Sequence, residues 1–158
     1  MTRTGSDAAL LLRRLVLAVL TLGLLGVLAD LIVLKHFEDS WQLVPLVLIG
    51  LSLGAIVWYL CGGGAASIRL LQLLMVFCVA AGALGVLLHY RGNLEFQLEI
   101  DASQHGWDLF RKVIHAKAPP ALAPGAMAQL GLLGLAYAFR HPALGQVAAS
   151  ESSTLRGV

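Results

Sequence analysis

Apolar residues are gathered into four long runs along the chain, and charged residues are almost confined to the segments between them. The runs cover residues 15–34, 43–60, 70–88 and 121–139. Each is close to the roughly 20 residues that a helix needs to cross about 30 Å of hydrocarbon. Backbone polar groups in lipid must be paired internally, and the runs lack the alternation of barrel strands. The pattern therefore predicts an all-α integral membrane protein: a four-transmembrane-helix bundle that forms one domain over residues 1–158.

The composition supports a membrane protein over a soluble one. Hydrophobic residues make up 58% of the chain and charged residues only 13%. A soluble domain is roughly half apolar and a quarter charged. A chain of 158 residues could not hide this much apolar surface in a soluble core.

The first run also has features of a signal peptide. Arg13 and Arg14 precede the apolar stretch, and Val27 and Ala29 suit a cleavage site. However, the apolar run continues to Leu34, which favours a retained membrane anchor.

Basic residues indicate the orientation of the predicted spans. On one side they are Arg3, Arg13, Arg14, Arg69 and Arg140, and on the other Lys35, Arg91, Arg111, Lys112 and Lys117. Short cytoplasmic segments carry an excess of Lys and Arg. Longer connections follow this rule less strictly, and four of the second group lie in one such connection. We therefore predict a multi-pass protein of the cell (inner) membrane with both termini cytoplasmic. The opposite orientation stays open, because the two counts are nearly equal.

Small residues at four-residue spacing predict close helix packing. The candidates are Gly50 and Gly54, Ala81 and Gly85, and Gly134 and Ala138. Small side chains let helix backbones approach each other in a membrane. The spacing suits both a compact bundle and a homo-oligomer. The two cysteines, Cys61 and Cys78, differ in predicted depth, so no disulfide is expected.

Asp30 is the one charged residue inside a predicted span. An acid in this position usually faces a partner, a cavity or water. One interpretation places the carboxylate near the headgroups or beside Lys35. The other pairs it with His89 or Arg91, which close the third span at the same depth, and gives a proton-sensitive contact.

Most of the remaining polar chemistry lies in the two outer connections, which hold four of the five histidines. The candidate binding residues are Asp30, His36, Glu38, His89, Arg91, Glu95 and Glu99. Histidine with carboxylate suits a divalent metal, but no short metal-ligand spacing occurs among them. We therefore predict no metal site and no cofactor.

The outer connection of residues 91–117 is predicted to form a short cap. Apolar and polar residues alternate from Leu94 to Ile100, which is a strand pattern and suggests an extended segment. Asp101 is a possible helix cap, and after it Trp107 and Phe110 begin a pattern with helical spacing. The opposite face of this predicted helix is basic, as in an interfacial helix. Its apolar face also includes Val113 and Ile114. A flexible tail is expected over residues 142–158.

No catalytic motif appears in the sequence, and a net charge of +2 is too small to indicate nucleic-acid binding. Nothing in the sequence argues for an enzyme. The favoured function is a membrane accessory or assembly protein whose cap contacts a larger membrane or periplasmic partner.

Two alternatives stay open. One is a transport or proton-linked subunit that uses Asp30 and His89. The other is a metal-dependent membrane enzyme with His36, His89, Glu95 and Glu99 at its outer face.

Overall fold

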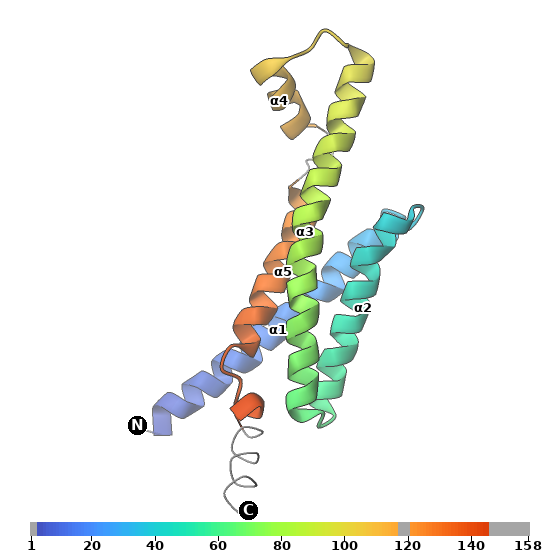
Figure 1. Ribbon diagram of the computed structural model, residues 1–158. Helices are drawn as coiled ribbons and strands as arrows, with labels where there is room; N and C mark the ends of the chain where they lie inside the picture. The colour runs from blue at the N-terminus through green and yellow to red at the C-terminus, as the bar shows by residue number, and fades with distance from the viewer. Residues whose placement is uncertain (1–2, 117–120, 146–158) are drawn as a thin grey trace, which may run out of the picture.

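The computed structural model describes residues 3–116 and 121–145, and all regular secondary structure within them is helical. This part of the chain contains five helices of more than one turn, which Figure 1 labels. They are α1 (Arg3–Val33), α2 (Ser40–Leu60), α3 (Gly64–Ile100), α4 (Gly106–Ile114) and α5 (Leu122–Ala138).

Three of these helices, α1, α2 and α3, are long and apolar enough to cross a membrane. This supports the predicted class of an all-helical, membrane-embedded protein. The fourth predicted span corresponds to α5, an apolar helix of 17 residues. At 1.5 Å per residue α5 is about 26 Å long, slightly shorter than a typical hydrocarbon core of about 30 Å.

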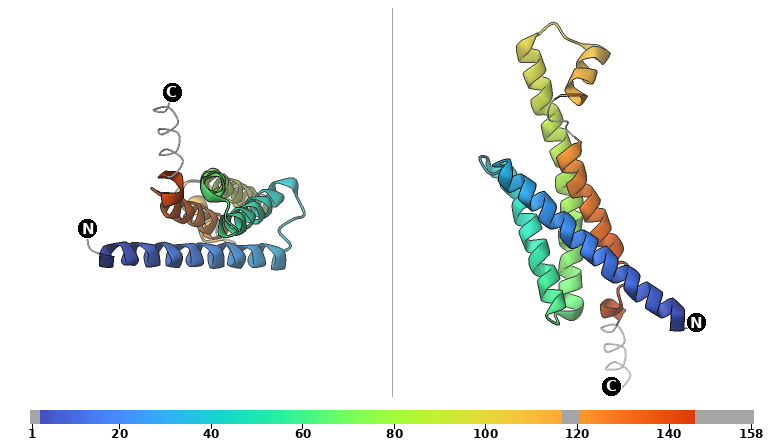
Figure 2. Two further views of the ribbon diagram at one scale, coloured as in Figure 1. Left: turned by 90° about the horizontal axis from the view of Figure 1, so that it is seen from below. Right: turned by 180° about the vertical axis from the view of Figure 1, so that it is seen from behind.

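Helix α3 lies at the centre of the arrangement, where it packs against α2, α4 and α5. Helix α1 crosses the other helices obliquely along one side, where it contacts α2 and α5 (Figure 2). The buried apolar core draws side chains from all four long elements, among them Leu20, Leu24, Ile49, Ile56, Leu71, Met75 and Met127.

Local sequence explains how the first three helices are joined. Gln42 accepts hydrogen bonds from the backbone N–H groups of Glu38 and Asp39, at 2.9 and 3.3 Å, and so stabilises the start of α2. Between α2 and α3, Gly62 and Gly64 have φ angles of +98° and +56°, which are strained for residues with a Cβ. The glycine run thus forms a tight turn that returns the chain alongside α2.

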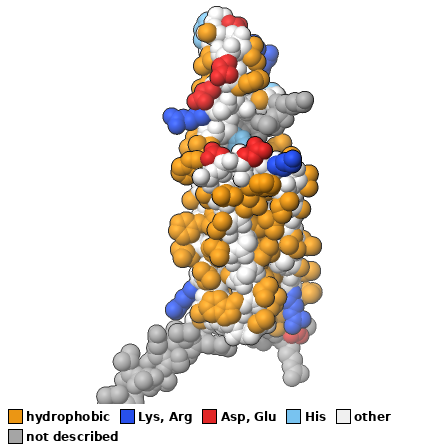
Figure 3. All heavy atoms as spheres, turned by 90° about the vertical axis from the view of Figure 1, so that its right-hand side faces the viewer, with side chains coloured by type: hydrophobic (Ala, Val, Ile, Leu, Met, Phe, Trp, Pro, Cys, Tyr) orange, Lys and Arg blue, Asp and Glu red, His pale blue; other side chains and the backbone are white. Residues whose placement is uncertain are grey.

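Large apolar side chains cover the outside of the long helices. Leu22, Leu51 and Phe77 on α1, α2 and α3 are 69%, 54% and 51% exposed. Figure 3 shows such side chains as a belt on one face, with acidic and histidine side chains gathered above it. A continuous apolar surface of this extent fits contact with lipid.

The segment Leu94–Ile100 is helical, so the prediction of an extended segment is wrong. It forms the last turns of α3, with Leu94 and Leu98 half-buried and Phe96 and Ile100 exposed. Adding residues to an existing helix costs far less than starting one, whereas a lone strand would leave its edges unpaired. The alternation in the sequence coincides with a helix whose partly buried side faces α4.

Helix α4 begins at Gly106, five residues later than the predicted cap at Asp101. The Asp101 carboxylate instead accepts hydrogen bonds from the backbone N–H and the hydroxyl of Ser103, at 3.0 and 2.6 Å. These bonds lower the pKa of Asp101. Short acidic side chains often close turns in this way, and here the turn reverses the chain between α3 and α4.

Parts of two predicted regions lie outside the described residues. Lys117, the last residue of the predicted cap, is among them, as are residues 146–158 of the expected flexible tail. Residues 142–145, at the start of that tail, form one helical turn.

Candidate functional site

The end of α3 and the whole of α4 form a helical hairpin that extends beyond α1, α2 and α5 (Figure 1). We call residues 90–114 the projecting hairpin. Helix α3 has 37 residues, so at 1.5 Å per residue it is about 56 Å long, well beyond the thickness of the hydrocarbon core. A single continuous helix therefore supports this hairpin.

Few contacts hold α4 against α3. Val113 is fully buried, and its carbonyl oxygen accepts a hydrogen bond from the side chain of Asn93 at 3.4 Å. Nearer the turn, the Gln104 amide donates to the Gln97 carbonyl oxygen at 3.4 Å. The rings of Tyr90 and Phe110, 6.3 Å apart between centroids, add a contact between the two helices. The hairpin is thus closed by apolar and aromatic packing together with two side-chain hydrogen bonds.

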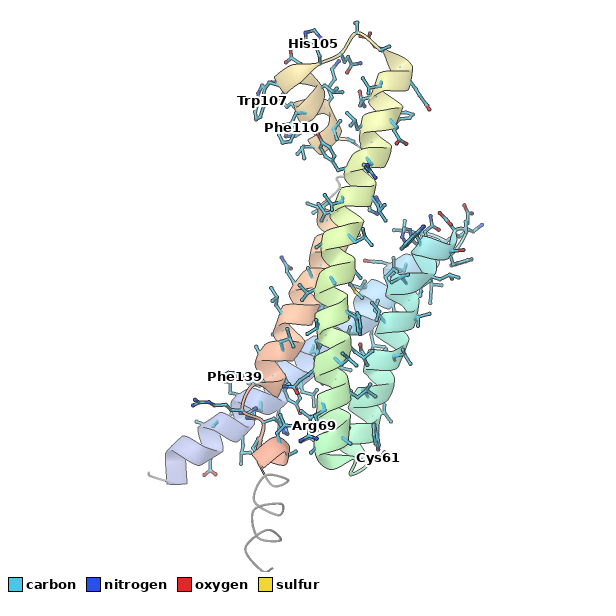
Figure 4. The ribbon with its side chains drawn as sticks, viewed as in Figure 1. Cys61, Arg69, His105, Trp107, Phe110 and Phe139 are labelled. Atoms are coloured by element: carbon cyan, nitrogen blue, oxygen red, sulfur yellow. The ribbon has the colours of Figure 1, made fainter. Side chains whose placement is uncertain are left out.

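The projecting hairpin exposes large apolar side chains. Phe96, Ile100 and Trp107 are 59%, 64% and 70% exposed. The rings of Trp107 and Phe110 stack with their centroids 5.1 Å apart, and Figure 4 shows Trp107 on the side of α4 turned away from α3. Of the predicted apolar face of α4, Val113 is buried, whereas Trp107 stays outside.

Basic residues lie beside these aromatic side chains. Arg111 and Lys112 are exposed on α4, and together with Gln97 and His115 they line an open hollow of about 520 Å³. The hairpin surface therefore combines exposed rings with charges of both signs, because acidic side chains such as Asp108 are exposed on it as well.

Two of the candidate binding residues meet at the base of the projecting hairpin. The rings of His36 and His89 are nearly parallel, with their centroids 6.1 Å apart. Burial, together with the neighbouring His89, lowers the pKa of His36. Asp30 is exposed, and its carboxylate forms no hydrogen bond or ion pair with any other described residue.

The other outer candidates are spread out. Arg91, Glu95 and Glu99 are exposed along α3, and Glu38 is exposed in the connection before α2. At 1.5 Å per residue, Glu99 lies about 15 Å from His89 along the helix. Within residues 3–116 and 121–145, no three His, Cys, Asp or Glu residues are grouped to hold a metal ion.

The tightest helix packing lies between α3 and α5. A Cβ atom added at Gly82 would lie 2.6 Å from the Pro124 carbonyl oxygen, and one at Gly131 would lie 2.7 Å from that of Met75. The sequence analysis did not single out either glycine. Gly85 and Gly134 lie in the same interface, against Pro124 and Met75 respectively.

The remaining small residues differ in their surroundings. Ala138 is fully buried and Ala81 is half-buried, whereas a Cβ atom at Gly50 or Gly54 would meet nothing within 4 Å. Cys61 is exposed and Cys78 is buried, and both are free thiols.

A second polar group lies at the opposite end of the molecule, where α1 begins and α5 ends. We call Arg13, Tyr59, Tyr137 and His141 the terminal cluster. The Arg13 guanidinium donates to the carbonyl oxygens of Tyr137, Phe139 and Arg140 at 2.9, 3.2 and 3.1 Å. These carbonyls at a helix end have no partner within the helix, so Arg13 caps α5 from another helix.

The rings of the terminal cluster are packed together. The His141 ring lies 5.2 Å from that of Tyr59 and 5.3 Å from that of Tyr137, between centroids. His141 is only 6% exposed, and its burial and the nearby Arg13 lower its pKa. In the sequence, Arg13 indicates orientation and resembles part of a signal peptide, and His141 has no predicted role, because no local pattern links residues more than 120 positions apart.

Comparison with known proteins adds no relative: no family model, curated protein or solved structure is significantly similar to the chain.

Proposed function

We propose that this chain is a small integral membrane accessory or assembly protein, and that its projecting hairpin contacts a larger membrane or periplasmic partner. The observation that carries this proposal is the length of α3, which continues as one helix of 37 residues past the apolar part of the molecule. Helix α3 carries the exposed Phe96 and Ile100, and it supports α4 with the exposed Trp107, so that all three lie away from the packed helices. Exposed apolar side chains on a rigid support are typical of a binding surface.

The direction of α4 favours a protein partner over the lipid surface. A helix that binds the membrane interface lies in the membrane plane with its apolar face towards the acyl chains. Here α4 folds back beside α3 and buries Val113 against it (Figure 1). Trp107 is left on the far side of α4, where a partner could cover it.

We further propose that α5 completes a four-helix bundle, with both termini cytoplasmic and the projecting hairpin outside. Support comes from the apolar sequence of α5 and its packing along α3. Arg13 and Arg14 lie beside the end of α5, and Figure 4 shows Arg69 at the end of the molecule away from the hairpin, as the excess of cytoplasmic basic residues requires.

Site-specific photocrosslinking in intact membranes tests the proposed contact. A photoreactive residue at Trp107 and one at Phe96 should capture the same single protein. The control is Phe77, an aromatic residue on the apolar part of α3 that is 51% exposed. Capture of lipid alone at Trp107, or of the same protein at all three positions, would contradict the proposal.

A double substitution provides the matching loss of function. Trp107→Ser with Phe96→Ser should remove the partner from the protein purified in mild detergent. Because both side chains are exposed, the free energy of unfolding should change by about 0.5 kcal/mol or less. A partner that stays bound at full stoichiometry would show that the hairpin is not the contact.

The orientation has its own test. A reporter that is active only in the cytoplasm, fused after Val158, should be active. Activity of an exclusively periplasmic reporter at the same position would place the projecting hairpin on the cytoplasmic side and overturn the proposed topology.

A further inference from the structure

A cavity of about 460 Å³ opens beside the terminal cluster, at the end of the molecule opposite the projecting hairpin. One wall is a single face of α1, formed by Leu10, Arg13, Arg14 and Leu17 at positions i, i+3, i+4 and i+7. The end of α2 and the segment after α5 complete the cavity. Three separate parts of the chain therefore build it.

The charge of the cavity is positive. Arg13 and Arg14 line it, and no Asp or Glu of residues 3–116 and 121–145 does so. Asp7 lies one turn before Leu10 on α1, outside the lining. An anion could enter this cavity without meeting a carboxylate on its walls.

Arg13 and Arg14 differ in how many of their hydrogen-bond donors are already used within the protein. Arg13 uses three N–H groups on the carbonyl oxygens at the end of α5, whereas a guanidinium carries five. Arg14 is exposed, and its guanidinium donates no hydrogen bond to any described residue. Arg14 can thus bind a ligand without giving up a contact that holds the fold together.

His141 supplies a further donor at the cavity wall. Its Nδ1 accepts a hydrogen bond from the backbone N–H of Ala143 at 3.2 Å, so the proton of the neutral ring is on Nε2. That Nε2–H has no partner in the described part of the chain. Tyr59, whose hydroxyl can donate, also lines the cavity.

The cavity is also partly apolar and lies at the edge of the membrane-spanning region. Leu10, Leu17 and Leu60 line it beside the polar groups. Arg13 and Arg14 directly precede the apolar run of residues 15–34, which places them at the level of lipid headgroups. A ligand that fits both features has an anionic group joined to an apolar chain.

We propose that this cavity binds a phosphate group, with Arg14, the spare Arg13 donors and the His141 Nε2–H as its hydrogen-bond donors. Guanidinium groups form strong charge-assisted hydrogen bonds with phosphate oxygens. The phosphate can come from a lipid headgroup, whose acyl chain then follows Leu17 along α1, or from free phosphate in solution.

Ligand-dependent thermal unfolding of the full chain in uncharged detergent, without phosphate buffer, tests the proposal. The ligands are short-chain phosphatidylglycerol, short-chain phosphatidylcholine and inorganic phosphate. Arg14→Gln removes the free cation of the cavity. Arg69→Gln is the matched control, because Arg69 is exposed at the same end of the molecule but does not line the cavity.

Phosphatidylglycerol should raise the unfolding midpoint of the wild type and of Arg69→Gln alike, and its apparent affinity should fall about tenfold in Arg14→Gln. Stabilisation by phosphatidylglycerol alone identifies a lipid headgroup, and equal stabilisation by inorganic phosphate identifies the free anion. An unchanged response in Arg14→Gln, an equal loss in Arg69→Gln, or equal stabilisation by phosphatidylcholine would overturn the proposal.

Discussion

Aromatic and basic side chains have opposite environments at the two ends of the molecule. In the projecting hairpin, Trp107 is 70% exposed and the basic residues beside it face outwards. In the terminal cluster, Tyr137 and His141 are only 4% and 6% exposed, and Arg13 is bound to the end of α5. Substitutions at the hairpin surface should therefore change binding without changing stability, whereas those in the terminal cluster should affect the fold itself.

The largest effect is expected between the two ends, at the interface of α3 and α5. In Gly82→Ala, the new methyl group would lie 2.6 Å from the Pro124 carbonyl oxygen and 2.7 Å from the Ala128 backbone nitrogen. The helices must separate, which should lower the free energy of unfolding by about 3 kcal/mol. The control, Gly54→Ala, adds a methyl group that meets nothing and should be neutral or slightly stabilising. Denaturant titration in detergent measures both variants.

Removing the guanidinium of the terminal cluster should have the next largest effect. Arg13→Gln loses three hydrogen bonds to carbonyl oxygens that have no partner within α5, so we expect a loss of about 2 kcal/mol. Hydrogen exchange should rise over residues 139–145, while the projecting hairpin stays unchanged. Arg69→Gln, at the same end, should leave both readouts at the wild-type level.

A smaller, local effect is expected in the projecting hairpin. Val113→Ala removes two buried carbons from the contact between α4 and α3 and should weaken it by about 1.5 kcal/mol. Hydrogen exchange should increase in α4 and at the end of α3, but not in α1 or α2. Trp107→Ala, in the same helix, should leave exchange unaltered. If Val113→Ala also loosened α1 and α2, the hairpin and the bundle would not be separate units.

Acidification should have the smallest effect, and it acts at both ends. The pKa values of His36 and His141 lie below the ordinary value of about 6.5, so the folded protein binds fewer protons than the unfolded chain just below that pH. Their contribution to stability is complete above this pH and decreases as the pH falls through it. The midpoint of thermal unfolding should fall as the pH is lowered from about 7.5 to about 5.5. In His36→Gln the midpoint should depend less steeply on pH. An unchanged slope would exclude the contact between His36 and His89 as its source.

The sequence predicted the helical class and the positions of the apolar parts well, but not where the helices end. The third run was placed at 70–88, whereas α3 covers Gly64–Ile100. Hydropathy detects the residues that face lipid, and a helix that continues into water carries no such signal. Residues 94–100 show the difficulty most clearly, because a short alternating segment fits both a strand and the edge of a helix.

The candidate sites were harder to predict, since they depend on how the helices cross. In the sequence, Arg13 indicates the orientation of a predicted span. Arg13 can cap α5 because α1 crosses the end of that helix in the folded protein, which the sequence does not reveal. Gly50 and Gly54 match the small-residue pattern better than Gly82 and Gly131 do. Yet only the second pair lies against another helix backbone, because spacing along one helix does not say which face meets a neighbour.

Helix α3 also acts as a lever arm. It is continuous from the turn at Gly64 to Ile100, so its tilt in the bilayer fixes the position of the hairpin at its far end. Over a length of about 56 Å, a change in tilt of about 10° moves that end sideways by about 10 Å. Membrane helices tilt in response to bilayer thickness. The exposed rings of the projecting hairpin would therefore move sideways along the membrane surface when the thickness of the surrounding membrane changes.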